Sequence, residues 1–435
     1  MSSIFIEGGY PLQGEVKPTG SRMIALKLIA ACILSNDSVV LDNVPKVTPV
    51  LRFINLVKYL GGSADWFSEN KLQITGANIS SYEIPKEYGI NLKHILLFAG
   101  PLLHRFGKAV IPVPVGSPIN RWIDSWESLG VDVEEKEGFI YLTGKNLHGA
   151  NINFRTSTHT GTDNAILSSV FIEGETFIVN AAEEPEVGEL IEFLNMIGGQ
   201  IERVEPRRIR IIGKNVFTGG FFEIQSDSTE VVAYATAALV TEGNISIKGI
   251  SKLGITAYVN FLAKIGAKYE YLKDTLSVWC TGEPLKPTDV ITGPFPGFLS
   301  EWLPYSTLLL SMIEGNSTLH DTVYLDRMGF VQDMNRMGAS VEVVKPSDVG
   351  QQCVISDDSY NFGKYGEPNT VIKVTGVEKF RGMKIGLSNS RFDPALIIAC
   401  FSASGKSEIQ DFENNAYVFD KFLEKLMLLG AHFTK

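Results

Sequence analysis

The segment IFIEGGYPLQGEV (residues 4–16) decides the fold, because five related segments follow it along the chain. Each is a short apolar strand that ends at a glycine, followed by a turn and a second strand. The other copies read LQITGANISSYEI, IYLTGKNLHGANI, IRIIGKNVFTGGF, LSVWCTGEPLKPTDV and IKVTGVEKFRGMKI. Their glycines are Gly8, Gly76, Gly144, Gly213, Gly282 and Gly376, at spacings of 68, 68, 69, 69 and 94 residues. This regularity indicates an internal repeat.

An amphipathic helix recurs with the same period. Its copies read FINLVKYLGG, WIDSWESLGV, LIEFLNMIGG, YVNFLAKIGA, VQDMNRMGAS and FLEKLMLLGA, and each stops at a glycine, the residue that most easily ends a helix. A further helix and strand lie between these segments, so each repeat reads β-α-β-α-β-β. Because the apolar face of each helix needs a sheet to cover it, we predict an α/β fold of six βαβαββ repeats.

The ends of the chain predict how the repeats are divided. The last helix stops at Gly430 and only AHFTK follows, so the sixth repeat lacks the strand pair with which the chain begins. We therefore predict two domains of three repeats each, one formed by residues 21–228 and the other by residues 1–20 with 229–435. An open solenoid is the alternative. The one long spacing reflects a polar insertion at 345–369, which we expect to be a surface excursion.

Composition narrows the class of protein. A net charge of −10 disfavours a broad nucleic-acid surface. No secretory signal or run long enough to span a bilayer is visible, and the four cysteines form no CxxC pair, so we expect a cytoplasmic protein without a metal site. Neither GxGxxG nor GxxxxGK[ST] occurs, so nothing supports a dinucleotide cofactor or a P-loop, and we expect no cofactor.

Several stretches resemble the enolpyruvyl transferases, most closely the branch that uses UDP-N-acetylglucosamine in cell-wall synthesis. They are GGYPLQGEVKPTGSRMIAL, VPVGSPINRWID, GPFPGFLSEW and LDRMGF, and the resemblance covers nearly the whole chain except residues 345–369. It implies that each domain is an inside-out α/β barrel. It also implies transfer of the enolpyruvyl group of phosphoenolpyruvate to a sugar hydroxyl, with release of phosphate, in a cleft between the domains.

The resemblance assigns catalytic roles to three arginines and substrate-binding roles to Lys93 and Met23. Arg22, Arg121 and Arg391 fall where the family binds phosphate and carboxylate, and Lys93 falls where it has another arginine. Arg22 replaces the usual lysine, and Met23 replaces the polar amide that contacts the sugar. Arginine keeps the charge in a planar fork that suits phosphate. The alternative is that the three arginines are solvated surface residues.

Two further catalytic positions also depart from the family pattern. Ser117 stands where most members have a cysteine that acts as acid and nucleophile, and a hydroxyl is much poorer in both roles. Glu301 stands where the family has an aspartate proposed to take the hydroxyl proton. The alternatives are an inert connecting loop around Ser117 and a carboxylate that stabilises a helix N-terminus at Glu301.

The remaining positions are implied to bind substrate. Asp124 matches a nucleotide-binding spacing, His159 and Gly161 lie near the diphosphate-binding loop, and Asp227 and Arg327 occupy family-like positions. Asp227 and Arg327 could instead form interdomain ion pairs, and a lone histidine is more often structural than a ligand.

The combined departures from the family favour an unusual acceptor. We expect the partners to be phosphoenolpyruvate and a hydroxyl-bearing sugar nucleotide or nucleoside, with no nucleic acid and no membrane. The alternative is a non-catalytic or regulatory paralogue that binds a phosphorylated ligand.

Overall fold

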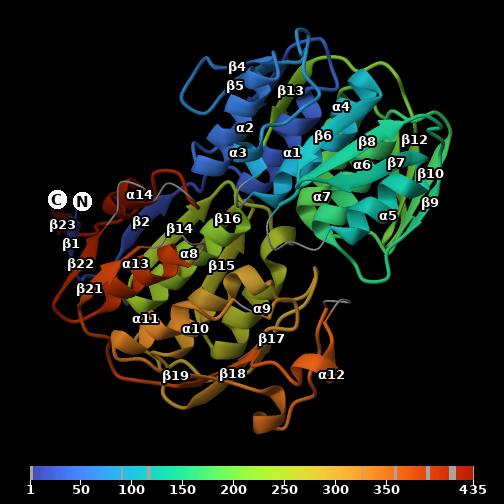
Figure 1. Ribbon diagram of the computed structural model, residues 1–435. Coiled ribbons are helices and arrows are strands. Elements are labelled where there is room, and N and C mark those ends of the chain that lie inside the picture. Colours follow the sequence, from blue (N-terminus) through green and yellow to red (C-terminus); the bar gives the residue numbers. More distant parts are fainter. Residues whose placement is uncertain are drawn as a thin grey trace. The chain divides into compact units, whose positions relative to one another are not determined.

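The computed structural model describes residues 3–89, 92–114, 119–325, 327–356, 360–387, 392–410 and 418–434. It separates into two compact units, one of residues 20–225 and one of residues 1–19 with 226–435. We call them the 20–225 unit and the 226–435 unit. In Figure 1 the first runs from blue to green, and residues 226–435 run from yellow-green to red.

Within the described residues of the 20–225 unit, strands form three sheets with a common plan. An edge strand runs parallel to its neighbour, and two antiparallel pairings follow. In the third sheet the parallel edge is reduced to a bridge between Glu83 and Val110. The first sheet is β13 (Gly220–Glu223), β3 (Val39–Asp42), β5 (Leu72–Thr75) and β4 (Ser63–Trp66); the second is β9 (Asn151–Asn153), β10 (Glu175–Val179), β12 (Arg208–Ile212) and β11 (Ile201–Glu205); the third is β6 (Lys108–Pro112), β8 (Phe139–Gly144) and β7 (Val131–Lys136).

The described strands of the 226–435 unit repeat the same plan in three more sheets. The first is β2 (Gln13–Val16), β14 (Asn244–Lys248), β16 (Thr275–Trp279) and β15 (Lys268–Leu272); the second is β17 (Val290–Ile291), β18 (Asn316–His320), β20 (Val371–Thr375) and β19 (Ser340–Val344); the third is β21 (Lys384–Gly386), β22 (Lys406–Gln410), β1 (Ser3–Glu7) and β23 (Phe433–Thr434). Six sheets of one topology confirm the predicted α/β repeat fold.

Both ends of the chain lie in the same sheet. Strand β1 pairs antiparallel with β22 on one side and with β23 on the other (Figure 1). Strand β2 runs parallel to β14 and completes a second sheet of the 226–435 unit. The strand pair at the start of the chain therefore supplies two of the strands of this unit.

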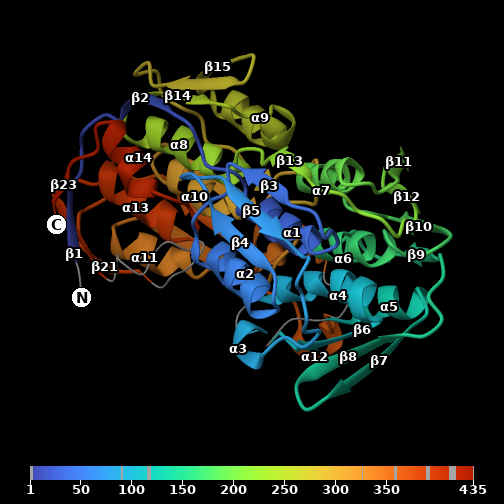
Figure 2. The same ribbon diagram turned by 90° about the horizontal axis from the view of Figure 1, so that it is seen from above.

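Buried helices form the centre of each unit. In the 20–225 unit, α1 (Arg22–Cys32), η1 (Lys93–Phe98) with α4 (Ala99–Phe106), and α6 (His159–Ser169) are buried along most of their length and pack on one another. A helix that is apolar on all sides belongs in a core. The amphipathic partners are α2 (Thr48–Tyr59), α5 (Asn120–Ser128) and α7 (Pro185–Met196), and a short α3 spans Lys86–Gly89. Figure 2 shows α1 and α2 beside strands β4 and β5.

The 226–435 unit has an equivalent centre. Its mutually packed helices are α8 (Ser228–Val240), α10 (Leu303–Leu310) with the preceding turn η3 (Ser300–Trp302), and α13 (Asp393–Ser402). The amphipathic helices are α9 (Thr256–Ile265), α11 (Phe330–Arg336) and α14 (Phe422–Leu428), with the turn η2 at Leu253–Ile255. Strands bury alternate residues, so helices cover one face of each sheet and solvent reaches the other, as an inside-out barrel requires.

The insertion lies between β19 and β20. Its described residues include the turn η4 (Pro346–Val349) and the short helix α12 (Phe362–Tyr365), and Gln351 donates a hydrogen bond to Thr318 of β18 at 3.1 Å. Among the described residues, no helix combines the length and apolar character needed to cross a bilayer.

Candidate functional site

The N-terminal ends of the central helices of the 20–225 unit carry three of the predicted site residues. Arg22 is the first residue of α1, Lys93 the first of η1 and His159 the first of α6. One contact joins α1 to α6, because Nζ of Lys27 lies 2.7 Å from Nε2 of His159, and the charge of Lys93 at the start of η1 lowers the pKa of the same imidazole. The starts of η1 and α6 therefore lie near Lys27 of α1, and the placement of Arg22 beside Lys93 and His159 stays a prediction.

This end of the unit is suited to an anion. Helix N-termini expose unpaired N–H groups and the positive end of the helix dipole. The first turn of α6 is tightly built, because Thr158 Oγ1 accepts a hydrogen bond from Gly161 N at 3.3 Å. A Cβ at Gly161 would lie 2.4 Å from Cγ2 of Thr158, so only glycine fits there. Met23 is half-buried beside Arg22.

A buried ion pair lies directly behind His159. Nζ of Lys27 is 2.9 Å from Oδ1 of Asp163, and neither side chain is exposed. Burial raises the pKa of the Asp163 carboxyl to about 6, against the opposing effect of the Lys27 charge. Burial, followed by the charges of Lys27, His94 and Lys93, holds the pKa of His159 well below its ordinary value. These effects disfavour the charged form of His159.

Helix α5 carries Arg121 and Asp124. Arg121 is half-buried in the first turn, and its carbonyl accepts a hydrogen bond from Ser125 at 2.8 Å; Asp124 is exposed. Trp126 is fully buried and donates to Ser168 of α6 at 3.1 Å. Trp122 is also buried, so both indoles are core residues and neither offers an exposed face on which a base could stack.

In the 226–435 unit, Glu301 and Arg327 form an ion pair. Nη1 of Arg327 donates to Oε1 of Glu301 at 2.8 Å, and the guanidinium lies over the ring of Tyr324. Burial opposes the charge on Arg327, but Glu301 and then Tyr324 outweigh it, so the pKa of the guanidinium lies above its usual value. The two predicted residues are thus partners within one unit.

Asp321 ties together the two segments that carry this pair. Its fully buried carboxylate accepts from the Ser300 hydroxyl at 2.5 Å and from Tyr324 N at 3.2 Å. It also accepts from the Thr292 hydroxyl and Val323 N. Since Ser300 precedes Glu301 and Tyr324 leads towards Arg327, Asp321 positions both members of the ion pair.

Asp227 serves as the N-cap of α8. Its Oδ1 accepts from Thr229 N at 2.9 Å and Glu230 N at 3.3 Å, which is the usual capping arrangement. This is a structural role, and the predicted substrate contact of Asp227 stays a prediction. Ser117 and Arg391 lie outside the described residues, so their roles also stay predictions.

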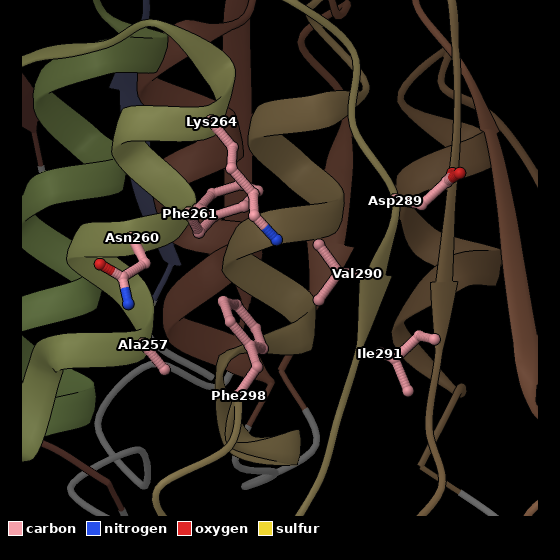
Figure 3. A pocket seen from close by; sticks show the side chains of 8 residues that line it. All are labelled: Ala257, Asn260, Phe261, Lys264, Asp289, Val290, Ile291 and Phe298. Carbon is pink, nitrogen blue, oxygen red and sulfur yellow. The ribbon is translucent and has the colours of Figure 1, made fainter.

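A small pocket in the 226–435 unit lies away from these groups. It has a volume of about 230 Å³ between α9 and β17, with Phe261 and Phe298 inside and Lys264 and Asp289 on opposite sides (Figure 3). Asp289 already accepts two hydrogen bonds from Thr318. None of the predicted site residues lines this pocket, so we assign it no role.

Sequence reasoning missed Lys27, Asp163 and Asp321. A signal for the first was present, because Lys27 interrupts the apolar run MIALKLIAACIL, and a charge on a buried helix needs a partner. Its partner lies in a different repeat, and nothing in the sequence singles out Asp163.

Comparison with known proteins agrees with the architecture described above. Residues 6–426 match the family described as EPSP synthase (3-phosphoshikimate 1-carboxyvinyltransferase). The chain is 31% identical over 435 residues to a UDP-N-acetylglucosamine 1-carboxyvinyltransferase 1 of Legionella pneumophila, covering 98% of this chain and 81% of the relative. It is 28% identical to the UDP-N-acetylglucosamine 1-carboxyvinyltransferase of Hydrogenovibrio crunogenus, covering 99% of each.

Two solved structures share the fold. The enolpyruvyl transferase NikO from Streptomyces tendae superimposes with a TM-score of 0.85 at 18% identity, covering 99% of this chain and 98% of that one. EPSP synthase from Acinetobacter baumannii superimposes with a TM-score of 0.73 at 16% identity over the whole of both chains.

Proposed function

Because the chain belongs to the EPSP synthase family of enolpyruvyl transferases, we propose that it moves the enolpyruvyl group of phosphoenolpyruvate to a hydroxyl of a sugar nucleotide or nucleoside. Phosphate is the leaving group. The family and the class of transferase follow from the comparisons, and the acceptor and the roles of individual residues are the proposed part.

The observation that supports the proposal is that Lys93 and His159 stand at the starts of η1 and α6 near Lys27, with Arg22 as the first residue of α1. Phosphoenolpyruvate carries a phosphate and a carboxylate, and a nucleoside diphosphate sugar adds further anionic oxygens. Two cationic side chains beside helix N-termini suit such groups better than a neutral substrate. In the proposal, Arg22 and Lys93 hold anionic oxygens, and His159 donates a hydrogen bond to the substrate.

The 226–435 unit supplies the carboxylate that the chemistry needs. The acceptor oxygen forms a bond to C2 of phosphoenolpyruvate as its proton passes to Glu301, and C3 takes a proton from an acid, the role that the resemblance gives to the position of Ser117. That position then takes back a proton from C3 as the bond between C2 and the phosphate oxygen breaks, which releases phosphate and restores the double bond. Arg327, held by its 2.8 Å contact, keeps Glu301 in place for this step.

The identity of the acceptor is inferred from the relatives and from Met23. The names of the relatives make UDP-N-acetylglucosamine the first candidate. Met23 stands beside Arg22 in the first turn of α1, where a thioether is a poor hydrogen-bond partner. An acceptor that needs no polar contact at this position fits the chain best.

The test is release of phosphate from phosphoenolpyruvate with a panel of acceptors, starting with UDP-N-acetylglucosamine, UDP and uridine, followed by mass spectrometry of the product. We expect acceptor-dependent release and a product heavier by one enolpyruvyl group. Arg22→Gln should lower kcat/KM for phosphoenolpyruvate by roughly 10–100-fold, since it removes hydrogen bonds to an anion. Arg336→Gln, which removes an exposed arginine at the end of α11, is the matched control.

Binding of phosphoenolpyruvate without release of phosphate, for every acceptor in the panel, would contradict the proposal and favour a non-catalytic paralogue.

A further inference from the structure

We infer that Lys27 and Asp163 are positioning residues that hold His159 in the tautomer with its proton on Nδ1, so that the ring presents a hydrogen-bond donor to the substrate. The functional part of this inference rests on the proposed function, in which His159 contacts the substrate. The tautomer itself is a property of the free protein.

The geometry around Nε2 sets the tautomer. Nζ of Lys27 lies 2.7 Å from Nε2 of His159 and 2.9 Å from Oδ1 of Asp163. An ammonium group has three donors and no acceptor, so Nε2 must accept with its lone pair. The proton of a neutral imidazole must then be on Nδ1.

Burial, and then the surrounding charges, lower the pKa of the imidazole. Lys27 contributes a cation from α1, and Lys93 and His94 of η1 act in the same direction. On the opposing side, Oδ2 of Asp163 is 3.8 Å from Nε2, farther than the ammonium.

Two further carboxylates interact with Asp163. Glu186 of α7 raises the pKa of Asp163, and Asp163 in turn contributes to the raised pKa of Glu184, which directly precedes α7. The nearest charge to the ring is therefore the cation of Lys27. It disfavours a second proton on the imidazole.

The ring of His159 is partly open to solvent. The His159 side chain is 24% exposed, whereas Lys27 and Asp163 are fully buried. Among the described residues, no hydrogen bond occupies Nδ1. His159 thus joins a buried ion pair to the N-terminus of α6.

Stability alone does not account for the pair. An apolar pair of similar volume is often as stable as a buried ion pair, because the two charges lose their hydration. Lys27 stands among apolar neighbours in α1, where a leucine or methionine would also pack. Control of His159 gives the charged pair a function that an apolar pair lacks.

The experiment is nitrogen NMR of the full chain labelled with ¹⁵N-histidine, with His159 assigned by the His159→Gln variant. In the wild type we expect one protonated Nδ1 and one unprotonated Nε2, unchanged when the pH falls from 8 through the ordinary histidine pKa of about 6.5. A proton on Nε2, or titration near that ordinary value, would overturn the inference.

Variants separate positioning from packing. In Lys27→Met, His159 should lose the fixed tautomer and titrate closer to the ordinary histidine pKa, because Asp163 is then its nearest charge. Lys27→Arg should keep the Nδ1 proton, because a guanidinium also only donates. Lys425→Met breaks a comparable buried ion pair in the other unit and should leave the His159 signals unchanged.

Kinetics provide the second readout. Lys27→Met should raise KM for the acceptor by roughly tenfold with kcat nearly unchanged, as expected for loss of one oriented hydrogen bond. An unchanged tautomer in Lys27→Met would overturn the inference, and if that variant does not fold, the wild-type and Lys27→Arg spectra decide. Absence of transferase activity in the wild type would contradict the proposed function and leave the NMR result standing.

Discussion

Thr19 donates two hydrogen bonds to one oxygen of Glu230, from its backbone N–H at 2.9 Å and from its hydroxyl at 2.8 Å. Glu230 is fully buried, and its other oxygen accepts from Tyr234 at 2.8 Å and from Lys425 at 2.5 Å. Thr19 is the last residue of the N-terminal segment that belongs to the 226–435 unit. This carboxylate therefore fastens that segment to α8 and α14.

Thr19→Val should destabilise the 226–435 unit by about 1.5–3 kcal/mol, since it removes one hydrogen bond to a buried charge. Glu230→Gln should cost more, about 3–5 kcal/mol, because it leaves Lys425 buried without its carboxylate. Native-state hydrogen exchange of α8 measures the loss. Thr256→Val, at an exposed threonine of α9, is the control, and equal protection in all variants would refute this role of Glu230.

Glu189 should make the stability of the 20–225 unit depend on pH. Burial raises the pKa of this carboxyl to about 8, although it accepts a hydrogen bond from Gln225 N. A folded-state pKa above the unfolded value of 4.5 contributes stability that is complete below pH 4.5 and is lost as the pH rises through 8. The loss amounts to at most about 5 kcal/mol.

Glu189→Gln should remove most of this dependence, so that the variant gains stability over the wild type as the pH rises from 5 to 9. Hydrogen exchange of α7 across this range is the measurement. Glu192→Gln, at an exposed position of the same helix, should keep the wild-type slope. A constant difference between wild type and Glu189→Gln at all pH values would show that Glu189 stays ionised.

Glu301→Gln should lower kcat by roughly 10²–10⁴-fold with little change in KM, the usual contribution of a general base. The amide keeps the shape of the side chain but cannot accept the hydroxyl proton. The phosphate-release assay provides the measurement, and Glu283→Gln, at an exposed glutamate of the same unit, is the control. Full activity of Glu301→Gln would assign the base to another residue.

The chain should resist fosfomycin, an epoxide that alkylates the cysteine found in the related transferases at the position of Ser117. A serine hydroxyl has a much higher pKa than a thiol and does not open the epoxide unaided. Mass spectrometry after incubation should show no adduct within residues 112–121, and Ser117→Cys should create one. An adduct on the wild-type segment would show that the hydroxyl is activated.

The repeat plan could be derived from the sequence because it is written in local signals. Each repeat carries its own strand glycine and its own helix-stop glycine, and these depend only on backbone conformation within a few residues. The missing strand pair after Gly430 likewise pointed to the N-terminus, and β1 pairs with β22 and β23. The resemblance also singled out Arg22, Lys93 and Glu301, which the structure places at the starts of helices.

Only the tertiary structure showed which buried charged and polar residues contact one another. Lys27 and His159 are 132 residues apart, and Thr19 and Glu230 are 211 apart, so no local pattern links them. Their contacts arise because helices from different repeats pack into one core, where each buried charge needs a partner. The sequence by itself determined the repeating elements, since these depend on neighbouring residues. Packing in three dimensions determined the ion pairs, because the energy of a buried charge depends on groups that the chain brings near only when it folds.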